Sequence, residues 1–301
     1  LSPLAIVQDL LAANTQGTAY RIFLYIRLPR TLAAILAGSA LATAGALLQS
    51  VLGNSLASPN TIGVNAGASI FVMTLLAVAP TAYGLLPLAA FLGALLTAVL
   101  VYFLAIKAGA SRTAVILAGV AVSSFCTACT NALTNLLPSL QTLRGDFMVG
   151  SFSGVGMERL GYAAAYILPA LALAFLFRYD VSVLSLGSDT AASLGMRVRP
   201  MQGFFLLLAA ILAGGAVSFS GLVSFIGLIV PNALRLVAGS DERWLIPLCM
   251  VGGGVFALLC DILCRTLFVP YELPVGIMLA FLGAPFFLWL LMKGKRGRIH
   301  G

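Results

Sequence analysis

Long apolar blocks alternate with short polar connections along the whole chain. The blocks are roughly 18 residues or longer, the length at which an α-helix crosses a ~30 Å hydrocarbon layer. Lipid offers no hydrogen bonds to an exposed backbone, so helices are the expected form. We therefore expect an all-α, polytopic membrane protein in which residues 1–301 form a single transmembrane domain. The pattern predicts nine spans, at residues 31–52, 63–79, 87–106, 113–137, 161–178, 202–217, 222–237, 246–264 and 274–292.

Polar segments between the spans are short, and proline and glycine mark most of the boundaries. The spans at 202–217 and 222–237 lie so close together that a tight turn over Ser218–Gly221 is predicted between them. The longest connection runs from about Asp180 to Pro200. Within it, Ser188 or Asp189 is expected to cap a short helix that ends near Gly195.

Composition strengthens the membrane assignment. Of the 301 residues, 61% are hydrophobic and 9% are charged, and the mean hydropathy is +1.07. Soluble domains carry about 25% charged residues. A net charge of +8 is compatible with nucleic-acid binding. However, the basic residues sit at span ends and form no stripe interleaved with aromatic residues, so we set nucleic-acid binding aside.

The distribution of Lys and Arg predicts the orientation. The strongest basic cluster is Lys293–Arg298, which should be cytoplasmic. Nine spans then place the N-terminal segment outside, with eleven Lys and Arg residues inside and six outside. An outside N-terminus without a signal sequence is unusual, and residues 1–20 form only a short amphipathic stretch. We therefore expect that a span preceding Leu1 is missing from this sequence.

Titratable groups are too sparse for an active site, so an enzyme within the membrane is disfavoured. The one histidine, His300, lies at the extreme tail, and among the acids only Asp261 falls clearly within a span. Arg265 follows Asp261 at the i+4 position, which predicts a structural or docking ion pair rather than a proton relay. The few intramembrane acids also disfavour an ion-coupled secondary transporter. Nucleotide chemistry is assigned to a partner, since no phosphate-binding glycine loop of the Walker type is present.

Five cysteines lie in apolar blocks, at positions 126, 129, 249, 260 and 264. The pair Cys126-x-x-Cys129 has redox or metal-site spacing, but no second pair accompanies it. Small buried side chains are the better interpretation, and we expect neither a metal site nor a cofactor.

The chain resembles the permease family of ABC importers for iron–siderophore complexes, haem and cobalamin. The resemblance covers essentially the whole chain, and its specificity comes from many short motifs in a fixed order. They are Arg27–Thr31, Gly38–Gly45 with Gln49, Asn54–Pro59, Gly63–Val64, Leu117–Ala121, Gly150–Ser151, Ser193–Gly195, Gly221–Pro231, Asp261–Arg265, Glu272–Gly276 and Gly283–Phe286.

The resemblance implies ten spans per subunit, short cytoplasmic coupling helices and a dimer of permeases in the bacterial cytoplasmic membrane. Two ATPase subunits would sit below the dimer and a two-lobed substrate-binding protein above it. Arg27, Arg30 and Arg265 would dock the binding protein. The cytoplasmic gate would include Asn54, Leu56 and Ser111. The ATPase coupling loop would comprise Leu186, Gly187, Ser188, Asp189, Ser193, Leu194 and Gly195, although the residues alone are equally compatible with a solvated connector.

The expected function is thus ATP-driven import of a ferric siderophore by alternating access, with a pore lined weakly by Ser, Thr, Asn and apolar groups. Haem and cobalamin stay open as substrates, as do homodimer, heterodimer and a purely structural subunit. Two positions depart from the family pattern: Ser55 replaces a proline in the turn after Asn54, and Asn232 replaces a common histidine after Pro231.

Overall fold

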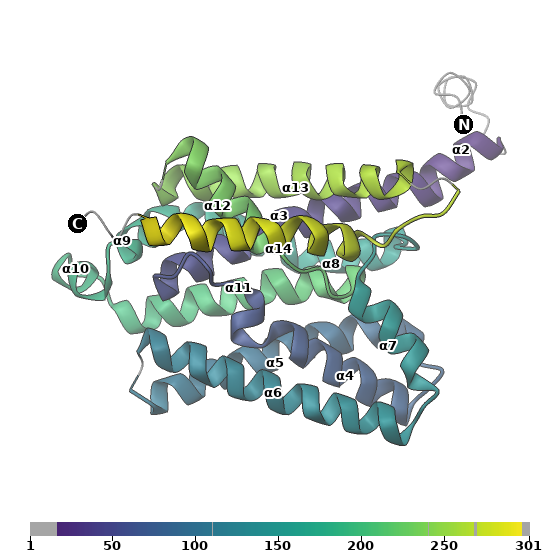
Figure 1. The fold of residues 1–301 in the computed structure, drawn as a ribbon, viewed down its shortest axis with the longest axis horizontal. Helices are drawn as coiled ribbons and strands as arrows, with labels where there is room; N and C mark the ends of the chain where they lie inside the picture. Colours follow the sequence, from purple (N-terminus) through teal and green to yellow (C-terminus); the bar gives the residue numbers. More distant parts are fainter. Residues whose placement is uncertain (1–16, 110, 240, 268–269, 297–301) are drawn as a thin grey trace.

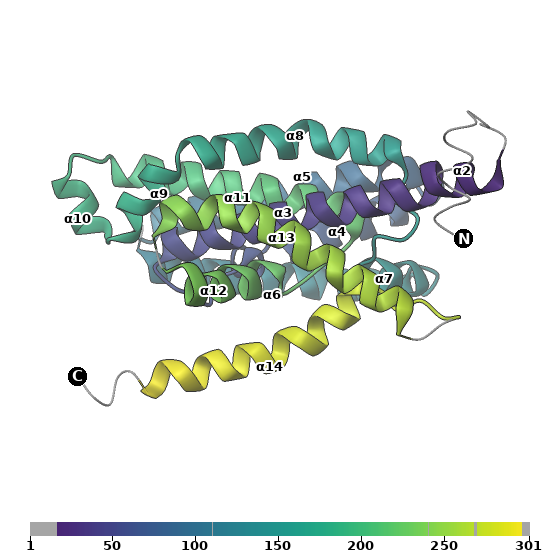
Figure 2. The same cartoon turned by 90° about the horizontal axis from the view of Figure 1, so that it is seen from above.

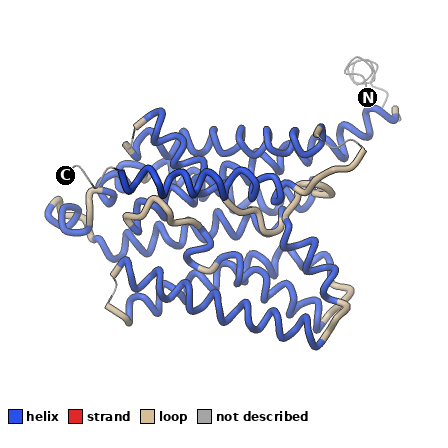
Figure 3. Tube along the Cα trace, viewed as in Figure 1, coloured by secondary structure: helices blue, strands red, loops and turns tan. Residues whose placement is uncertain are grey.

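The computed structural model describes residues 17–109, 111–239, 241–267 and 270–296. Within them every regular element is a helix (Figure 3). Nine principal helices run roughly along one direction (Figure 1), and each corresponds to one predicted span. They are α3 (Leu28–Leu52), α4 (Val64–Val78), α5 (Leu86–Lys107), α6 (Arg112–Leu136), α8 (Met157–Leu176), α11 (Val198–Ser220), α12 (Ile226–Ala238), α13 (Glu242–Thr266) and α14 (Val275–Arg296).

Six of these helices are long and apolar enough to cross a membrane on their own: α3, α5, α6, α8, α11 and α13. The described apolar stretches of α4, α12 and α14 are shorter, at 10–17 residues. The helical nature of all nine predicted spans is therefore confirmed, whereas full spanning length is met by six.

The first span begins earlier than predicted. Helix α2 (Thr18–Ile22) and the π-helical turn η1 (Phe23–Arg27) run directly into α3, so that Tyr20–Leu52 is one helical rod. Pro29 does not end it: the proline directly follows the π-helical turn, in which the Leu28 amide donates to the Phe23 carbonyl, so the regular α-helical hydrogen-bond pattern is already interrupted there. Most of the amphipathic stretch at residues 1–20 lies outside the described residues, as does His300.

Helix α3 is the buried centre of the bundle and packs against α11, α12 and α13. Two glycine pairs bring backbones into contact there. A Cβ on Gly38 would lie 2.1 Å from the Gly253 carbonyl oxygen, and one on Gly45 would lie 1.9 Å from that of Gly227. Membrane helices gain close van der Waals packing from such small residues. These contacts fix α13 against α3 at Gly38 and α12 against α3 at Gly45, two turns further along the helix.

The predicted tight turn at Ser218–Gly221 is wrong. Helix α11 continues through Ser220, and the hydroxyls of Ser218 and Ser220 donate to the Gly215 and Ala216 carbonyls one turn earlier in the helix. The connection is instead the non-helical segment 221–225, which ends at Phe225 with a φ of 69°. It starts beside α7 (Leu140–Val149), where the Leu222 amide donates to the Phe147 carbonyl at 2.9 Å.

Short helices occupy several predicted connections. Helix α7 follows α6, and α9 (Arg178–Ser185) precedes α10 (Ser188–Ser193) in the 180–200 segment. The expected short helix is α10, and it ends just before Gly195 as predicted, but the predicted N-cap is wrong. Gly187 is its N-cap and Leu194 its C-cap, so Ser188 and Asp189 belong to its first turn. Two 3-10 turns complete the described elements, η2 (Pro59–Ile62) and η3 (Tyr83–Leu85).

The two ends of the bundle carry different segments. Helices α9 and α10 and the last turns of α14 lie at one end, here called the α10 end (Figure 1). Helix α2, helix α7 and residues 270–274, which precede α14, lie at the opposite end, the α2 end. Helix α14 stands away from the body along one side, with α8 on the opposite edge (Figure 2).

Candidate translocation site

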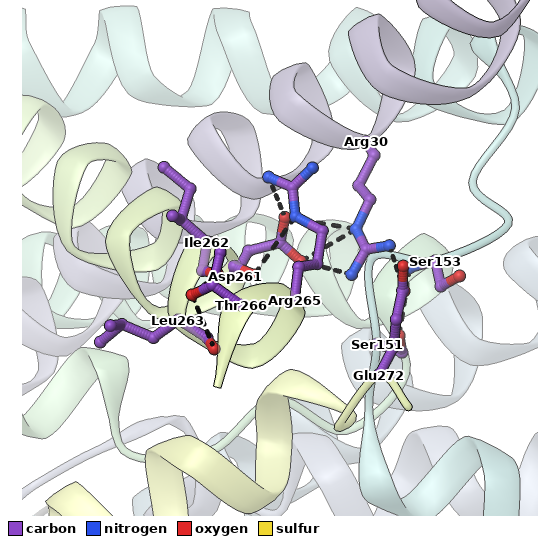
Figure 4. A network of polar contacts seen from close by, with 9 residues as sticks. All are labelled: Arg30, Ser151, Ser153, Asp261, Ile262, Leu263, Arg265, Thr266 and Glu272. Carbon is purple, nitrogen blue, oxygen red and sulfur yellow. Dashed lines mark hydrogen bonds and ion pairs between the residues drawn. The ribbon is translucent and has the colours of Figure 1, made fainter. Parts of the chain in front are cut away.

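A cluster of charged side chains joins α3 to α13 at the α2 end (Figure 4). The Arg30 guanidinium donates from Nε to Asp261 Oδ1 at 3.0 Å, and its second terminal nitrogen lies 2.9 Å from the same oxygen. Its remaining nitrogen donates to Glu272 Oε2 at 2.6 Å. Arg30 is 7% exposed and Asp261 is 1% exposed, whereas the Glu272 side chain is 51% exposed. Neither acid was expected as a partner of Arg30 from the sequence, in which they lie 231 and 242 positions away.

The predicted helix ion pair is present in this cluster, with Arg265 lying 3.0 Å from Asp261 Oδ2. Asp261 therefore stands between two guanidinium groups. Arg27, one turn before Arg30, is exposed and has no ion pair among the described residues. Of the three arginines expected to dock a binding protein, only Arg27 presents a free charge at the surface. Arg30 is satisfied within the protein, and Arg265 is partly exposed.

A second polar network lies in the half of the bundle nearer the α10 end, and the sequence analysis missed it. Gln49 donates to the carbonyls of Ala57 and Gly227 at 3.3 and 3.2 Å. The Gln49 amide oxygen accepts a hydrogen bond from Arg235, which also pairs with the buried Glu242 at 3.0 Å. Helices α3, α12 and α13 and the segment around Ala57 thus meet at two side chains, Gln49 and Arg235. Two signals in the sequence pointed to these residues: their polarity inside or beside apolar blocks, and the place of Gln49 in the motif with Gly38–Gly45.

Residues 53–58, the 53–58 loop, are held in place by two asparagines. The Asn54 side-chain oxygen accepts from the Leu56 amide at 2.9 Å, which closes a local turn. Asn232 of α12 donates to the Ser55 carbonyl at 2.8 Å. Thus the two positions that depart from the family pattern, Ser55 and Asn232, touch each other.

The other predicted gate residue, Ser111, caps α6. Its hydroxyl accepts from the Ala114 amide at 3.0 Å. The neighbouring Arg112 covers the 53–58 loop, since a Cβ on Gly53 would lie 2.2 Å from the Arg112 guanidinium. The structure therefore brings the two predicted gate segments together through Arg112 and Gly53.

A polar cavity of about 320 Å³ opens among η2, α4, α6, α7 and the 221–225 segment. Its lining is mainly hydroxyl and amide side chains, with one arginine. The residues are Asn60, Asn65, Ala66, Ser69, Ser123, Thr127, Thr130, Arg144, Met148, Leu222 and Ser224. Leu222 and Ser224 belong to the Gly221–Pro231 motif, but the cavity itself was not predicted, because its lining comes from five separate segments.

The predicted coupling segment forms an exposed knob at the α10 end (Figure 1). Helix α10 spans only Ser188–Ser193, and Ala191 is its buried residue. Leu186 and Leu194 flank the helix and are 62% and 64% exposed. The amide of Gly195, which has a φ of 86°, donates to the Ala192 carbonyl at 2.9 Å and follows the end of the helix.

No metal-binding cluster is found in the described part of the chain, where no three His, Cys, Asp or Glu side chains come together. All five cysteines are free thiols. Cys249, Cys260 and Cys264 are buried, as expected for small apolar side chains, whereas Cys126 and Cys129 are partly exposed.

Comparison with known proteins decides the family. The model of the FecCD transport family matches residues 1–293. The chain belongs to the FecCD transport family. It is 35% identical to the hemin transport system permease HmuU of Yersinia pestis, over 95% of this chain and 87% of that protein. It is 36% identical to the ferric enterobactin permease FepD of Escherichia coli, over 98% of this chain and 89% of that protein.

A further relative is the Fe(3+)-citrate import permease YfmD of Bacillus subtilis, 36% identical over 90% of this chain and 81% of that protein. The fold matches a structure described as an inward-facing metal-chelate type ABC transporter. That match has a TM-score of 0.82 and 26% identity, and covers 91% of this chain and 88% of the other. This FecCD member is therefore a multi-pass permease of the ABC importer type.

Proposed function

We propose that this permease moves a ferric siderophore from a binding protein on the α2 side to the cytoplasm on the α10 side, by alternating access. The observation that carries the proposal is the polar cavity. It lies within a bundle of apolar helices, and its hydroxyl and amide lining offers many weak contacts. Weak contacts suit a path through which a bulky complex must both enter and leave. Relatives named for haemin, ferric citrate and ferric enterobactin support an iron chelate as the cargo.

One copy of the chain forms only part of such a path. Helix α6 is mostly exposed although it is apolar, and α14 stands away from the body. An exposed apolar helix beside a polar cavity fits a second permease subunit that closes the other wall. We therefore infer a dimer of permeases whose pore lies between the two subunits.

The two ends of the bundle suit different partners. At the α10 end, Leu186 and Leu194 beside α10 offer apolar anchors for an ATPase subunit. At the α2 end, the free charge of Arg27 suits an acidic surface of a binding protein. Arg30 supports that surface by joining α3 to α13 through Asp261, and Arg265 pairs with the same carboxylate from one turn further along α13. ATP hydrolysis is assigned to the ATPase partner, and this chain performs no covalent chemistry.

The test is ATP-dependent uptake of a ferric siderophore into proteoliposomes that contain the permease, its ATPase and its binding protein. Haem and cobalamin are run in parallel to identify the cargo. Uptake of one of these chelates that needs ATP and survives collapse of the ion gradient supports the proposal. Uptake that is lost with the ion gradient and needs no ATP overturns it.

Docking is tested separately with Arg27→Glu. We expect lower uptake and weaker binding-protein stimulation of the ATPase, with unchanged basal ATPase activity, because the substitution repels an acidic partner. Arg159→Glu is the matched control, since Arg159 is exposed in the first turn of α8, at the same end. Equal effects of the two substitutions would contradict a specific role for Arg27. Arg30 is unsuitable for this test, because changing it leaves buried Asp261 with one partner fewer.

A further inference from the structure

A groove of about 500 Å³ lies at the α10 end, where the last turn of α8, the start of α9 and the first turns of α13 meet. It contributes no residue to the polar cavity. Helix α9 packs against α13 and α3 here. The groove has an apolar wall and a basic, aromatic rim, and neither part is used by the proposed transport path.

The rim places two arginines around one tyrosine. The Arg178 guanidinium lies 4.2 Å from the Phe175 ring centre and 4.7 Å from that of Tyr179, and it donates to the Phe175 carbonyl at 2.9 Å. Arg243 lies 6.0 Å from the Tyr179 ring centre. These cation–π contacts hold both guanidinium groups at the mouth of the groove.

The rim carries a net positive charge. Arg243 pairs with Asp241 at 3.0 Å, and hydrogen bonds from Arg243 lower the pKa of the Asp241 carboxyl, so this pair is ionised and neutral in sum. Arg178 pairs with no carboxylate among the described residues. Asp180, the acid nearest to it in sequence, is not part of the groove lining. The charge of Arg178 is therefore available to an anion.

The wall of the groove is apolar and faces outward. Pro247, Leu248 and Val251 form it along α13, and Val251 is 69% exposed. Trp244, in the first turn of the same helix, also lines the groove and is equally exposed. Tryptophan and tyrosine concentrate where a membrane meets water, and their position beside arginines at a span end is typical of the headgroup level. A chain-like apolar ligand with an anionic head fits both halves of the groove.

We propose that this groove binds one anionic phospholipid, whose phosphate lies between Arg178 and Arg243 and whose acyl chain follows Pro247, Leu248 and Val251. The proposal rests on the membrane role proposed above. Anionic lipids attract basic residues at a membrane surface, and the guanidinium fork matches a phosphate oxygen pair. The zwitterionic lipids of the same membrane lack the net charge that the rim selects.

The test is native mass spectrometry of the delipidated permease titrated with phosphatidylglycerol. Phosphatidylcholine with the same acyl chains is the reference lipid, and glycerol phosphate tests whether the headgroup alone suffices. We expect phosphatidylglycerol to bind more tightly than phosphatidylcholine, and glycerol phosphate not to compete. Arg178→Gln should weaken phosphatidylglycerol binding about fivefold. Val251→Trp should weaken both lipids by filling the apolar wall without changing charge.

Arg197→Gln is the matched control, because Arg197 is exposed at the same end but lies outside the groove. A loss in Arg197→Gln equal to that in Arg178→Gln would overturn the proposal, as would equal affinity for the two lipids. Full competition by glycerol phosphate would reassign the groove to a soluble anion and also overturn it. The measurement needs neither the ATPase nor a chelate, so a failed uptake assay would leave its result intact.

Discussion

Arg30 on α3 and Asp261 on α13 are 231 positions apart in the sequence and form a buried ion pair with contacts of 2.9 and 3.0 Å. Asp261 also pairs with Arg265, and Arg30 also pairs with Glu272. Two arginines near the end of apolar helices thus share one almost fully buried carboxylate. Removing one partner from a buried cluster of this kind costs far more than removing an exposed one.

Asp261→Asn should therefore destabilise the protein by about 3–5 kcal/mol, because two guanidinium groups lose the charge that balances them. The measurement is thermal unfolding of the purified permease in detergent. Glu272→Gln is the control, and we expect about 1 kcal/mol or less, since the Glu272 side chain is half-exposed. Similar losses for the two variants would show that burial does not govern this cluster.

The glycine contact between α3 and α13 gives a second prediction. Gly38→Ala should destabilise by about 1–3 kcal/mol or more, because its Cβ would lie 2.1 Å from the Gly253 carbonyl oxygen and the helices would have to separate. Gly161→Ala in α8 is the matched substitution, with no atom within 4 Å of its added Cβ. It should stabilise by about 0.5–1 kcal/mol through helix propensity. Unfolding temperatures that move in the same direction for both would contradict this packing.

Hydropathy alone predicted every principal helix, because the length of an apolar block is a local property. It did not locate the start of α12. Residues 222–237 form one apolar run, and the non-helical backbone at 221–225 depends on contacts with α7, such as that between Leu222 and Phe147. Helices α7 and α9 were missed for a related reason: they are short, and short helices owe their stability to packing against neighbours.

The candidate site was predictable only where its contacts are local. The Asp261–Arg265 pair follows from its i+4 spacing, and it is present at 3.0 Å. The pairing of Arg30 with Asp261 could not be read from the sequence, since nothing local specifies which helix lies beside α3. The same holds for the network of Gln49, Arg235 and Glu242, in which the bonded residues Gln49 and Arg235 are 186 positions apart.

The contact between Asn232 and Ser55 predicts a change in the mobility of the 53–58 loop. Asn232→Leu removes the donor to the Ser55 carbonyl at 2.8 Å while keeping a similar side-chain volume. We expect a cysteine placed at position 56 (Leu56→Cys) to react several-fold faster with a water-soluble maleimide in the Asn232→Leu background, because the loop opens more often.

The control for this labelling is Ser185→Cys, an exposed position on α9 at the same end. Its reaction rate should be the same with and without Asn232→Leu. An unchanged rate at position 56 would contradict a role for Asn232 in holding the loop. Parallel acceleration at both positions would indicate general loosening of the protein instead.

Arg144 is the one charged residue among the described residues that line the polar cavity, and it predicts charge selectivity along the path. Its guanidinium donates to the Thr134 hydroxyl at 3.1 Å and to the Met148 sulfur at 3.2 Å, and it has no ion pair among the described residues. Arg144→Gln keeps a polar side chain but removes the charge. Uptake of a negatively charged ferric chelate should fall roughly tenfold, the size expected for a lost charge-assisted hydrogen bond. Uptake of a neutral ferric chelate by the same proteoliposomes should change little.

Arg159→Gln is the control. It removes a charge from the exposed start of α8 and should leave both uptake rates unchanged. Equal losses for the charged and neutral chelates in Arg144→Gln would mean that Arg144 shapes the cavity without selecting its occupant by charge.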